Sequence, residues 1–144
     1  MYGFPQDHAK ALALWKRAAV LGCATAYHNV GFAYYNGRGV EVDKKKANHY
    51  WELAAMRGDA DSRYNLGLLE NKSGNKERAL KHYMIAVEFG CNDSLKQIQK
   101  LYSKGHVTKD VYTEALLFYQ NYLNEVKSSQ RDEAAAADQE FKYI

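Results

Sequence analysis

Residues 47–58 read ANHYWELAAMRG, and residues 11–22 and 79–90 read ALALWKRAAVLG and ALKHYMIAVEFG. All three follow the pattern A-x3-(W/Y)-x2-A-(A/V)-x2-G, and a fourth stretch at 115–123, ALLFYQNYL, keeps only its opening. The first alanines of the four stretches are 36, 32 and 36 residues apart. Recurrence at a near-constant interval of this size is typical of proteins that stack pairs of helices.

A second kind of segment precedes each of the later three stretches. It reads AYHNVGFAY at 26–34, SRYNLGLLE at 62–70 and, less closely, SLKQIQKLY at 94–102. The segment at 26–34 is linked to the stretch at 47–58 by NGRGVEVD at 36–43. This link has the glycines that a tight loop between helices needs for positive φ. In the next unit this link shrinks to NKSGN at 71–75, which accounts for the shorter interval.

The small residues of the pattern predict closely packed helices. Alanines and glycines let two backbones approach, and the Trp or Tyr is expected to fill the space between neighbouring units. The final glycine of each stretch is expected to end its helix in a left-handed cap. Asp43 and Asp110 are placed to act as N-caps or as first-turn acids of the helices that follow them.

The whole unit from Ala26 to Gly58 reads A-x2-N-(V/L)-G-x2-Y-x2-G-x-G-V-x2-D-x3-A-x3-W-x2-A-A-x2-G almost throughout. This unit resembles the Sel-one-like repeat (SLR), a relative of the tetratricopeptide repeat. The resemblance covers about residues 3–123 and fades towards the C-terminus, because the next unit lacks the G-x-G-V loop. It implies an all-α fold, an α-solenoid of stacked antiparallel helix pairs with about seven or eight helices.

The pattern divides the chain into two parts. Repeats are expected over residues 1–127, as a partial first unit followed by units that start near 23, 59 and 91. A C-terminal capping helix or tail is expected over 128–144, where Ser129 and Asp132 have capping-box spacing before an alanine run. The expected helices lie at about 8–21, 24–36, 44–57, 60–71, 76–89, 92–104, 110–127 and 130–142.

Residues 3–7 resemble the end of a repeat loop whose preceding helix is absent. Further repeats or domains of a longer parent protein are therefore expected. The first residues lack a charged head followed by an apolar core, so they do not resemble a signal peptide. We expect an intracellular, cytoplasmic location, with an organellar or lumenal one left open.

The charge pattern argues against nucleic acid as a partner. The formal net charge is +3, with basic and acidic residues interspersed, and the one basic run, at 44–46, is typical of a solvated helix start. No stretch approaches the ~18 apolar residues that a membrane span needs, so no direct membrane insertion is expected.

The sequence holds little that predicts chemistry. Its five histidines and two cysteines lack metal-ligand spacing, and Cys23 and Cys91, two units apart, are expected to be free, small packing residues. There is no G-x-S-x-G motif, and the glycines of the 36–43 link belong to the repeat and not to a phosphate loop. No catalytic residue, metal site or cofactor is therefore expected, and an enzyme is disfavoured.

Binding in solenoids is expected on the concave face, which the first helix of each pair lines. The repeat pattern assigns Ala26, Val30, Gly31 and Tyr34 to the interior, so helical spacing places other positions of that helix on the open face. Along this face the side chains run from aromatic to basic, with a series of amides between them. The candidate partner-binding residues are His28, Asn29, Phe32, Tyr35, Tyr64, Asn65, Leu68, Lys96, Gln97 and Lys100.

This order predicts a groove for an extended or helical protein segment with apolar anchors and an acidic end. For each residue a purely structural role is an alternative, since the asparagine belongs to the repeat pattern and the tyrosines can be core. The resemblance implies an adaptor or scaffold module for protein binding. A constitutive structural subunit of a larger assembly, packed through its convex face or its N-terminal end, is the alternative function.

Overall fold

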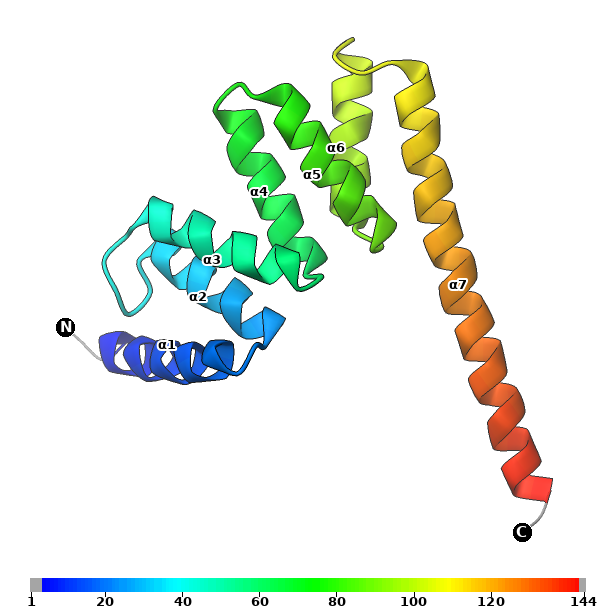
Figure 1. The fold of residues 1–144 in the computed structure, drawn as a ribbon, viewed down its shortest axis with the longest axis horizontal. Helices are drawn as coiled ribbons and strands as arrows, with labels where there is room; N and C mark the ends of the chain where they lie inside the picture. Colours follow the sequence, from blue (N-terminus) through cyan, green and yellow to red (C-terminus); the bar gives the residue numbers. More distant parts are fainter. Residues whose placement is uncertain (1–3, 143–144) are drawn as a thin grey trace.

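The computed structural model describes the backbone of residues 4–142 and the side chains of residues 7–139. This part of the chain folds into seven α-helices without a strand (Figure 1). The helices are α1 (Phe4–Val20), α2 (Ala24–Asn36), α3 (Lys44–Met56), α4 (Ala60–Lys72), α5 (Lys76–Glu88), α6 (Asn92–Ser103) and α7 (Lys109–Lys142).

Each helix packs mainly on its neighbours in the sequence. The pairs α2–α3 and α4–α5 are the most extensive contacts, α1 packs on α2, and α3 packs on α4. The helix α7 contacts both α5 and α6. Figure 1 shows the helices following one another in chain order, with α1 to α3 lying across the view and α4 to α7 standing steeply, and the expected all-α solenoid is confirmed.

The two tight pairs meet where a glycine faces an aromatic ring. A Cβ placed on Gly31 of α2 would lie 2.6 Å from the Trp51 indole of α3, and one on Gly67 of α4 would lie 2.5 Å from the Tyr83 ring of α5. Both rings are buried. The aromatic residue of each repeat therefore packs within its own helix pair, not only between units as the pattern predicts.

The small residues around these rings are also fully enclosed. Ala47, Ala54, Ala79 and Ala86 have no exposed surface, which confirms that the alanine positions bring the helices together. Two apolar clusters result. One joins α1 to α4 around Val30 and Trp51, and the other joins α5, α6 and α7 around Tyr83 and Ile98.

The helix ends follow the expected signals. The repeat-ending glycines Gly22, Gly58 and Gly90 have φ of 89°, 89° and 88°, which confirms the left-handed caps. Asp43 caps α3 by accepting a hydrogen bond from the Lys46 N–H (3.1 Å), and Asp110 lies in the first turn of α7.

The cysteines occupy the N-cap positions of two helices. Cys23 precedes α2 and Cys91 precedes α6, the places equivalent to Asp59 before α4. Both thiols are free, as expected. Cys91 is buried and accepts a hydrogen bond from the Ser94 hydroxyl (3.3 Å), whereas Cys23 is exposed, so its expected packing role is wrong.

The two ends of the described chain differ from expectation. The helix α1 begins at Phe4, so the loop expected at 3–7 is wrong for residues 4–7, and residue 3 lies outside the described backbone. The expected break near 128–130 is also wrong, because α7 runs without interruption from Lys109 to Lys142. Neither Gly nor Pro follows Gly105 in the sequence, so no helix-breaking residue interrupts α7 near Ser129 and Asp132, and both lie inside this helix.

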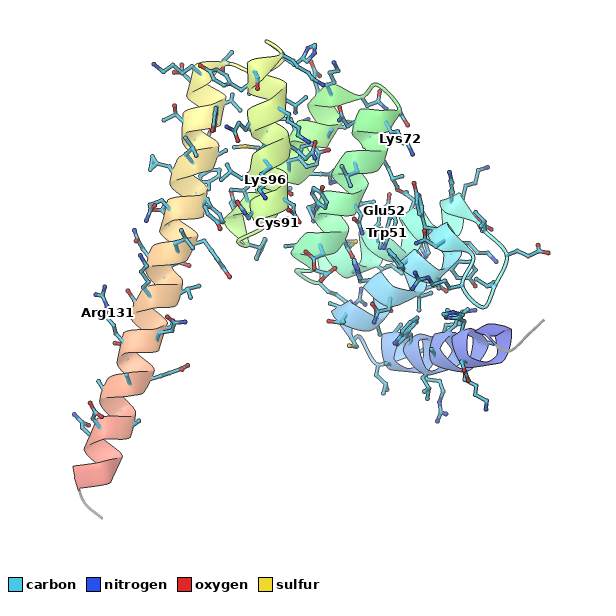
Figure 2. All side chains as sticks on the ribbon, turned by 180° about the vertical axis from the view of Figure 1, so that it is seen from behind. Trp51, Glu52, Lys72, Cys91, Lys96 and Arg131 are labelled. Carbon is cyan, nitrogen blue, oxygen red and sulfur yellow. The ribbon has the colours of Figure 1, made fainter. Side chains whose placement is uncertain are left out.

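The second half of α7 leaves the repeats. Every described side chain from residue 127 to residue 139 is exposed. Figure 1 shows this half extending beyond the other helices, and Figure 2 places Arg131 on it. The segment continues α7 as a projecting rod and does not cover the end of the solenoid.

We predict that Gly31→Ala destabilises the fold by about 1–3 kcal/mol, because the added methyl group would overlap the Trp51 indole and approach the Ala47 carbonyl oxygen (3.1 Å). Urea denaturation checks this. The matched control is Thr25→Ala at an exposed position of the same helix, which should change the free energy of unfolding by less than about 0.5 kcal/mol. Equal effects of the two substitutions would contradict the close approach.

The Tyr83 hydroxyl is buried and finds no hydrogen-bond partner among the described residues. Burial raises the pKa of Tyr83 to about 12. The equivalent Trp51 Nε1–H is satisfied, because it donates to the His28 carbonyl oxygen (3.2 Å).

We therefore predict that Tyr83→Phe leaves stability unchanged or raises it by up to about 1 kcal/mol, because it removes an unpaired polar atom. Trp51→Phe should instead cost about 1–3 kcal/mol through lost volume and a lost hydrogen bond. The melting temperatures of the two variants and of the wild type, from thermal unfolding, test both predictions. A strong loss of stability in Tyr83→Phe would show that the hydroxyl has a partner in solution.

Candidate functional site

The predicted binding residues lie on one series of helices, α2, α4 and α6. We call the surface that carries Phe32, Leu68 and Lys100 the groove face. It is hollowed at two places, one between α2, α3 and α4 and the other around the C-terminal end of α6. Six of the ten candidate residues line these hollows, four in the first and two in the second.

The first, apolar hollow has a volume of about 160 Å³. Its floor is the half-buried Tyr35 ring beside the Trp51 indole, with ring centroids 5.4 Å apart. Phe32 stands at its edge with 40% of its surface exposed. The full lining is Phe32, Tyr35, Asn36, Trp51, Asn65 and Leu68.

Two cations lie beside aromatic rings of this apolar hollow. The Arg38 guanidinium lies 5.1 Å from the centre of the Phe32 ring, and the Lys44 ammonium lies 5.2 Å from the centre of the Tyr35 ring. Such cation–π contacts hold the rings in place and put positive charge at the rim. An apolar side chain fits the centre of the hollow, and acceptor groups fit its border.

His28 has a structural role that the sequence did not reveal. Its Nδ1 lies 2.8 Å from the Ser62 hydroxyl oxygen and 3.1 Å from the Asp59 carboxylate. The Ser62 hydroxyl donates to the same carboxylate oxygen (2.5 Å), and Asp59 also accepts from the Ser62 N–H as the N-cap of α4. With the hydrogen on Nδ1, His28 joins the repeat unit that starts near residue 23 to the start of the unit near residue 59.

A Ser, a His and an Asp in contact invite comparison with a hydrolase triad, but the geometry differs. In a triad the serine and the carboxylate meet opposite nitrogens of the imidazole, whereas here both meet Nδ1. Ser62 is also completely buried, so a substrate cannot reach its hydroxyl. The three residues cap a helix.

The Asp59 carboxyl is partly withdrawn from water, with 20% of its side chain exposed. Burial alone would raise its pKa, but the hydrogen bonds from His28 and Ser62, together with the charge of His28, outweigh burial and lower the pKa below the ordinary 3.8. The folded protein therefore favours the ionised carboxylate.

The other candidate residues are distributed as follows. Tyr64 packs against Tyr83 (ring centroids 6.1 Å apart), and Asn29 is half-buried outside both hollows. Gln97 and Lys100 line the second hollow, and Lys96 is exposed on α6 (Figure 2). Asn65 and Gln97 thus line different hollows.

The structure adds residues that the sequence argument missed. Trp51 and Asn36 contribute to the apolar hollow, and Lys76, Lys104 and His106 contribute to the second hollow. All but Trp51 lie at helix ends or in loops. Periodicity within the first helix of each pair, which guided the prediction, carries no signal for them.

The described residues contain no group of three or more His, Cys, Asp or Glu side chains arranged to hold a metal ion. None of the described helices combines the length and the apolar character needed to cross a bilayer.

The repeat architecture has counterparts among known proteins. A family model described as the Sel1 repeat matches residues 1–23, 24–59 and 100–121, which together make up more than half of the chain. The chain belongs to the Sel1 repeat family. Residues 60–99, which include the shortened link, lie outside these Sel1 repeat matches.

Two curated proteins are similar in sequence to this Sel1 repeat chain. One is the ERAD-associated E3 ubiquitin-protein ligase component HRD3B of Arabidopsis thaliana, 35% identical over 83 residues, which are 56% of this chain and 12% of that protein. The other is chitin synthase regulatory factor 4 of Schizosaccharomyces pombe, 31% identical over 101 residues, which are 69% of this chain and 16% of that protein. The chain spans only a small part of each relative.

Solved structures agree on the fold. A Sel1 repeat protein from Oxalobacter formigenes superimposes with a TM-score of 0.66 at 27% identity, covering 81% of this chain and 49% of that one. A protective antigen of uropathogenic Escherichia coli with an SLR fold gives 0.65 at 20% identity, covering 79% and 26%. Sel1 repeat proteins are generally protein-interaction or adaptor modules on a helical scaffold that is generally non-enzymatic.

We predict that Asp59→Asn lowers stability by about 1 kcal/mol at pH 7, because the amide keeps the cap but loses the charge-assisted bond to His28. Because the pKa of Asp59 is lowered in the folded protein, wild type should have its full stability advantage over Asp59→Asn at pH values above 3.8. The advantage should shrink as the pH falls from 3.8 through the folded-state pKa.

Denaturation of both proteins between pH 2.5 and pH 7 measures this difference. Asp61→Asn, which changes an exposed carboxylate in the same helical turn, is the control and should show little pH-dependent difference. A difference between wild type and Asp59→Asn that stays constant down to pH 2.5 would contradict the assigned network.

Proposed function

We propose that this chain is an adaptor or scaffold module that binds an extended or helical segment of another protein on the groove face. An apolar side chain of that segment occupies the hollow between α2, α3 and α4. The observation that carries the proposal is this hollow, because it leaves apolar rings open to solvent at the junction of two repeats.

The arrangement of the hollow suits a side chain better than a small free ligand. It is open to solvent on one side, and its floor is formed by rings that the repeat packing already holds in place. A pre-formed apolar site lowers the entropic cost of binding, which is how a few anchors dominate the affinity of a protein interface. The amide of Asn65 at its edge can donate to and accept from the backbone of the bound segment.

The relatives are compatible with this role. The names of both curated relatives describe proteins that work with others, one as a component of a ubiquitin-protein ligase and one as a regulatory factor. By analogy, this chain brings a partner to a larger assembly. The basic residues at the other end of the groove face favour a segment with an acidic end.

One observation favours the alternative, a constitutive structural subunit. On α1, Leu14 is 62% exposed and Trp15 is only half-buried, whereas the equivalent Trp51 is 3% exposed beneath α2. A surface of this kind suits permanent packing against another helix. It lies on a different element from the groove face, so the two functions can be tested separately.

We predict that peptides selected from a random display library on the wild-type chain share an apolar anchor. Phe32→Glu should weaken their binding at least about tenfold in fluorescence anisotropy, because it places a charge at the rim of the apolar hollow. Met56→Glu, at an apolar residue that is 76% exposed outside the hollow, is the matched control and should leave the dissociation constant unchanged.

Circular dichroism must show that both variants keep the wild-type helix content and melting temperature. If the peptides bind Phe32→Glu as tightly as the wild type, the groove face is not the binding surface. If instead Leu14→Glu on α1 abolishes the binding of these peptides, the result supports the alternative function, in which α1 is the interface.

A further inference from the structure

The second hollow of the groove face is small and polar. It has a volume of about 60 Å³, and since one water molecule needs about 10–15 Å³ of such space, it has room for a few waters or one compact oxyanion. It lies where the C-terminal ends of α4 and α6 meet the start of α5. Its lining is Asn71, Lys76, Gln97, Lys100, Leu101, Lys104 and His106.

The ionisable groups that line this hollow are all basic. Three lysines and a histidine converge from α5, from α6 and from the segment after α6, and among the described lining residues none is Asp or Glu. The Lys76 ammonium lies 2.8 Å from His106 Nε2, so the ammonium donates to the imidazole. Lys76 thus has an imidazole as its neighbour in place of a carboxylate.

The closest turn of α4 does hold an acid, Glu70, but its carboxylate is already in use. It accepts from the Asn75 side-chain amide (2.9 Å) and lies 3.9 Å from the Arg78 guanidinium. The favourable interaction of lysines with the carbonyl end of α6 accounts for Lys100 and Lys104 separately. It does not account for Lys76 and His106, which come from outside that helix.

We propose that this basic hollow is a subsite for an oxyanion, a carboxylate or a phosphate group, carried by the protein segment that the groove face binds. The inference rests on the proposed function, since it names the chemistry of one part of the partner. Two or three ammonium groups around one small hollow match a compact anion, because each adds a charge-assisted hydrogen bond. Asn71 and Gln97 add neutral donors.

The two hollows are close enough for one short segment to fill both. Leu68 lines the apolar hollow and Asn71 lines the basic one, and they lie one turn apart on α4, about 4.5 Å along its axis. One hollow is lined from α2, α3 and α4, and the other from α4, α5 and α6, so about one helix diameter, roughly 10 Å, separates them across α4. An extended chain covers this distance in about three residues. We infer an acidic or phosphorylated residue about three positions from the apolar anchor.

The charge distribution disfavours a nucleic-acid backbone as the source of the anion. The basic hollow is a single small site, and the net charge of the chain is only +3. A phosphate backbone would need a continuous stripe of such residues.

The first experiment uses inorganic phosphate as the probe and does not depend on any partner. Phosphate added at constant ionic strength should shift the amide resonances around Lys100, Lys104 and His106 saturably in two-dimensional NMR, with sodium chloride as the reference salt. The variant Lys76→Gln, Lys100→Gln, Lys104→Gln should weaken this binding at least about tenfold. The control Lys45→Gln, Lys81→Gln, Lys127→Gln removes the same charge from exposed positions outside the hollow and should bind as the wild type does.

The second experiment uses synthetic peptides that carry one leucine anchor and, three residues away, Glu, phosphoserine, Ala or Lys. Glu or phosphoserine should bind at least about fivefold tighter than Ala, and Lys more weakly, with the advantage lost in the three-lysine variant. The stronger of Glu and phosphoserine identifies the source of the anion.

Phosphate shifts that chloride reproduces, or that persist in the three-lysine variant, overturn the subsite. Equal affinity of the Glu and Ala peptides for the wild type overturns its role in the groove. Failure of the proposed function looks different, because then the Ala peptide does not bind in the apolar hollow while phosphate still binds the lysines.

Discussion

The contact between a glycine and an aromatic ring on paired helices is the constraint on which the rest of the structure depends. Gly31 against Trp51 and Gly67 against Tyr83 allow the two helices of a pair to approach closely, at positions that leave no room for a side chain. In the third pair Gln99 stands where the glycine would be, Tyr119 is only half-buried, and α6 and α7 contact each other less extensively. The two pairs that have a glycine at this position are thus the pairs with the most extensive contacts.

The surface that we connect with binding is a consequence of that packing. Because Trp51 is held against Gly31, its other edge faces α4 and forms the floor of the apolar hollow. His28, Ser62 and Asp59 fix the angle between the same two units through a capped helix start. The residues that hold the repeats together and the residues that are open to a partner thus alternate along the same helices, which gives the groove face its rigidity.

The sequence predicts the fold well because each repeat restates the same local chemistry. Alanine spacing, the glycine caps and the aromatic positions are each visible in the pattern, and the structure confirms them. The candidate binding surface is predicted in part: Phe32, Tyr35, Asn65 and Leu68 do line one hollow, because they follow helical spacing. His28 could not be assigned, since its partners are 31 and 34 residues away and depend on the angle between units. Lys76 and His106 come from helix ends and loops, where periodicity says nothing.

The unbroken course of α7 has a mechanical consequence. A helix standing alone in water is marginal, because its first turn fixes many dihedral angles for one hydrogen bond. Here the turns packed against α5 and α6 provide that nucleus, and the alanine-rich turns beyond residue 127 only have to propagate it. Weaker packing of α7 against α5 and α6 would thus also shorten the projecting part of α7. The helical length of this projecting part therefore depends on how firmly α7 packs on the last repeat.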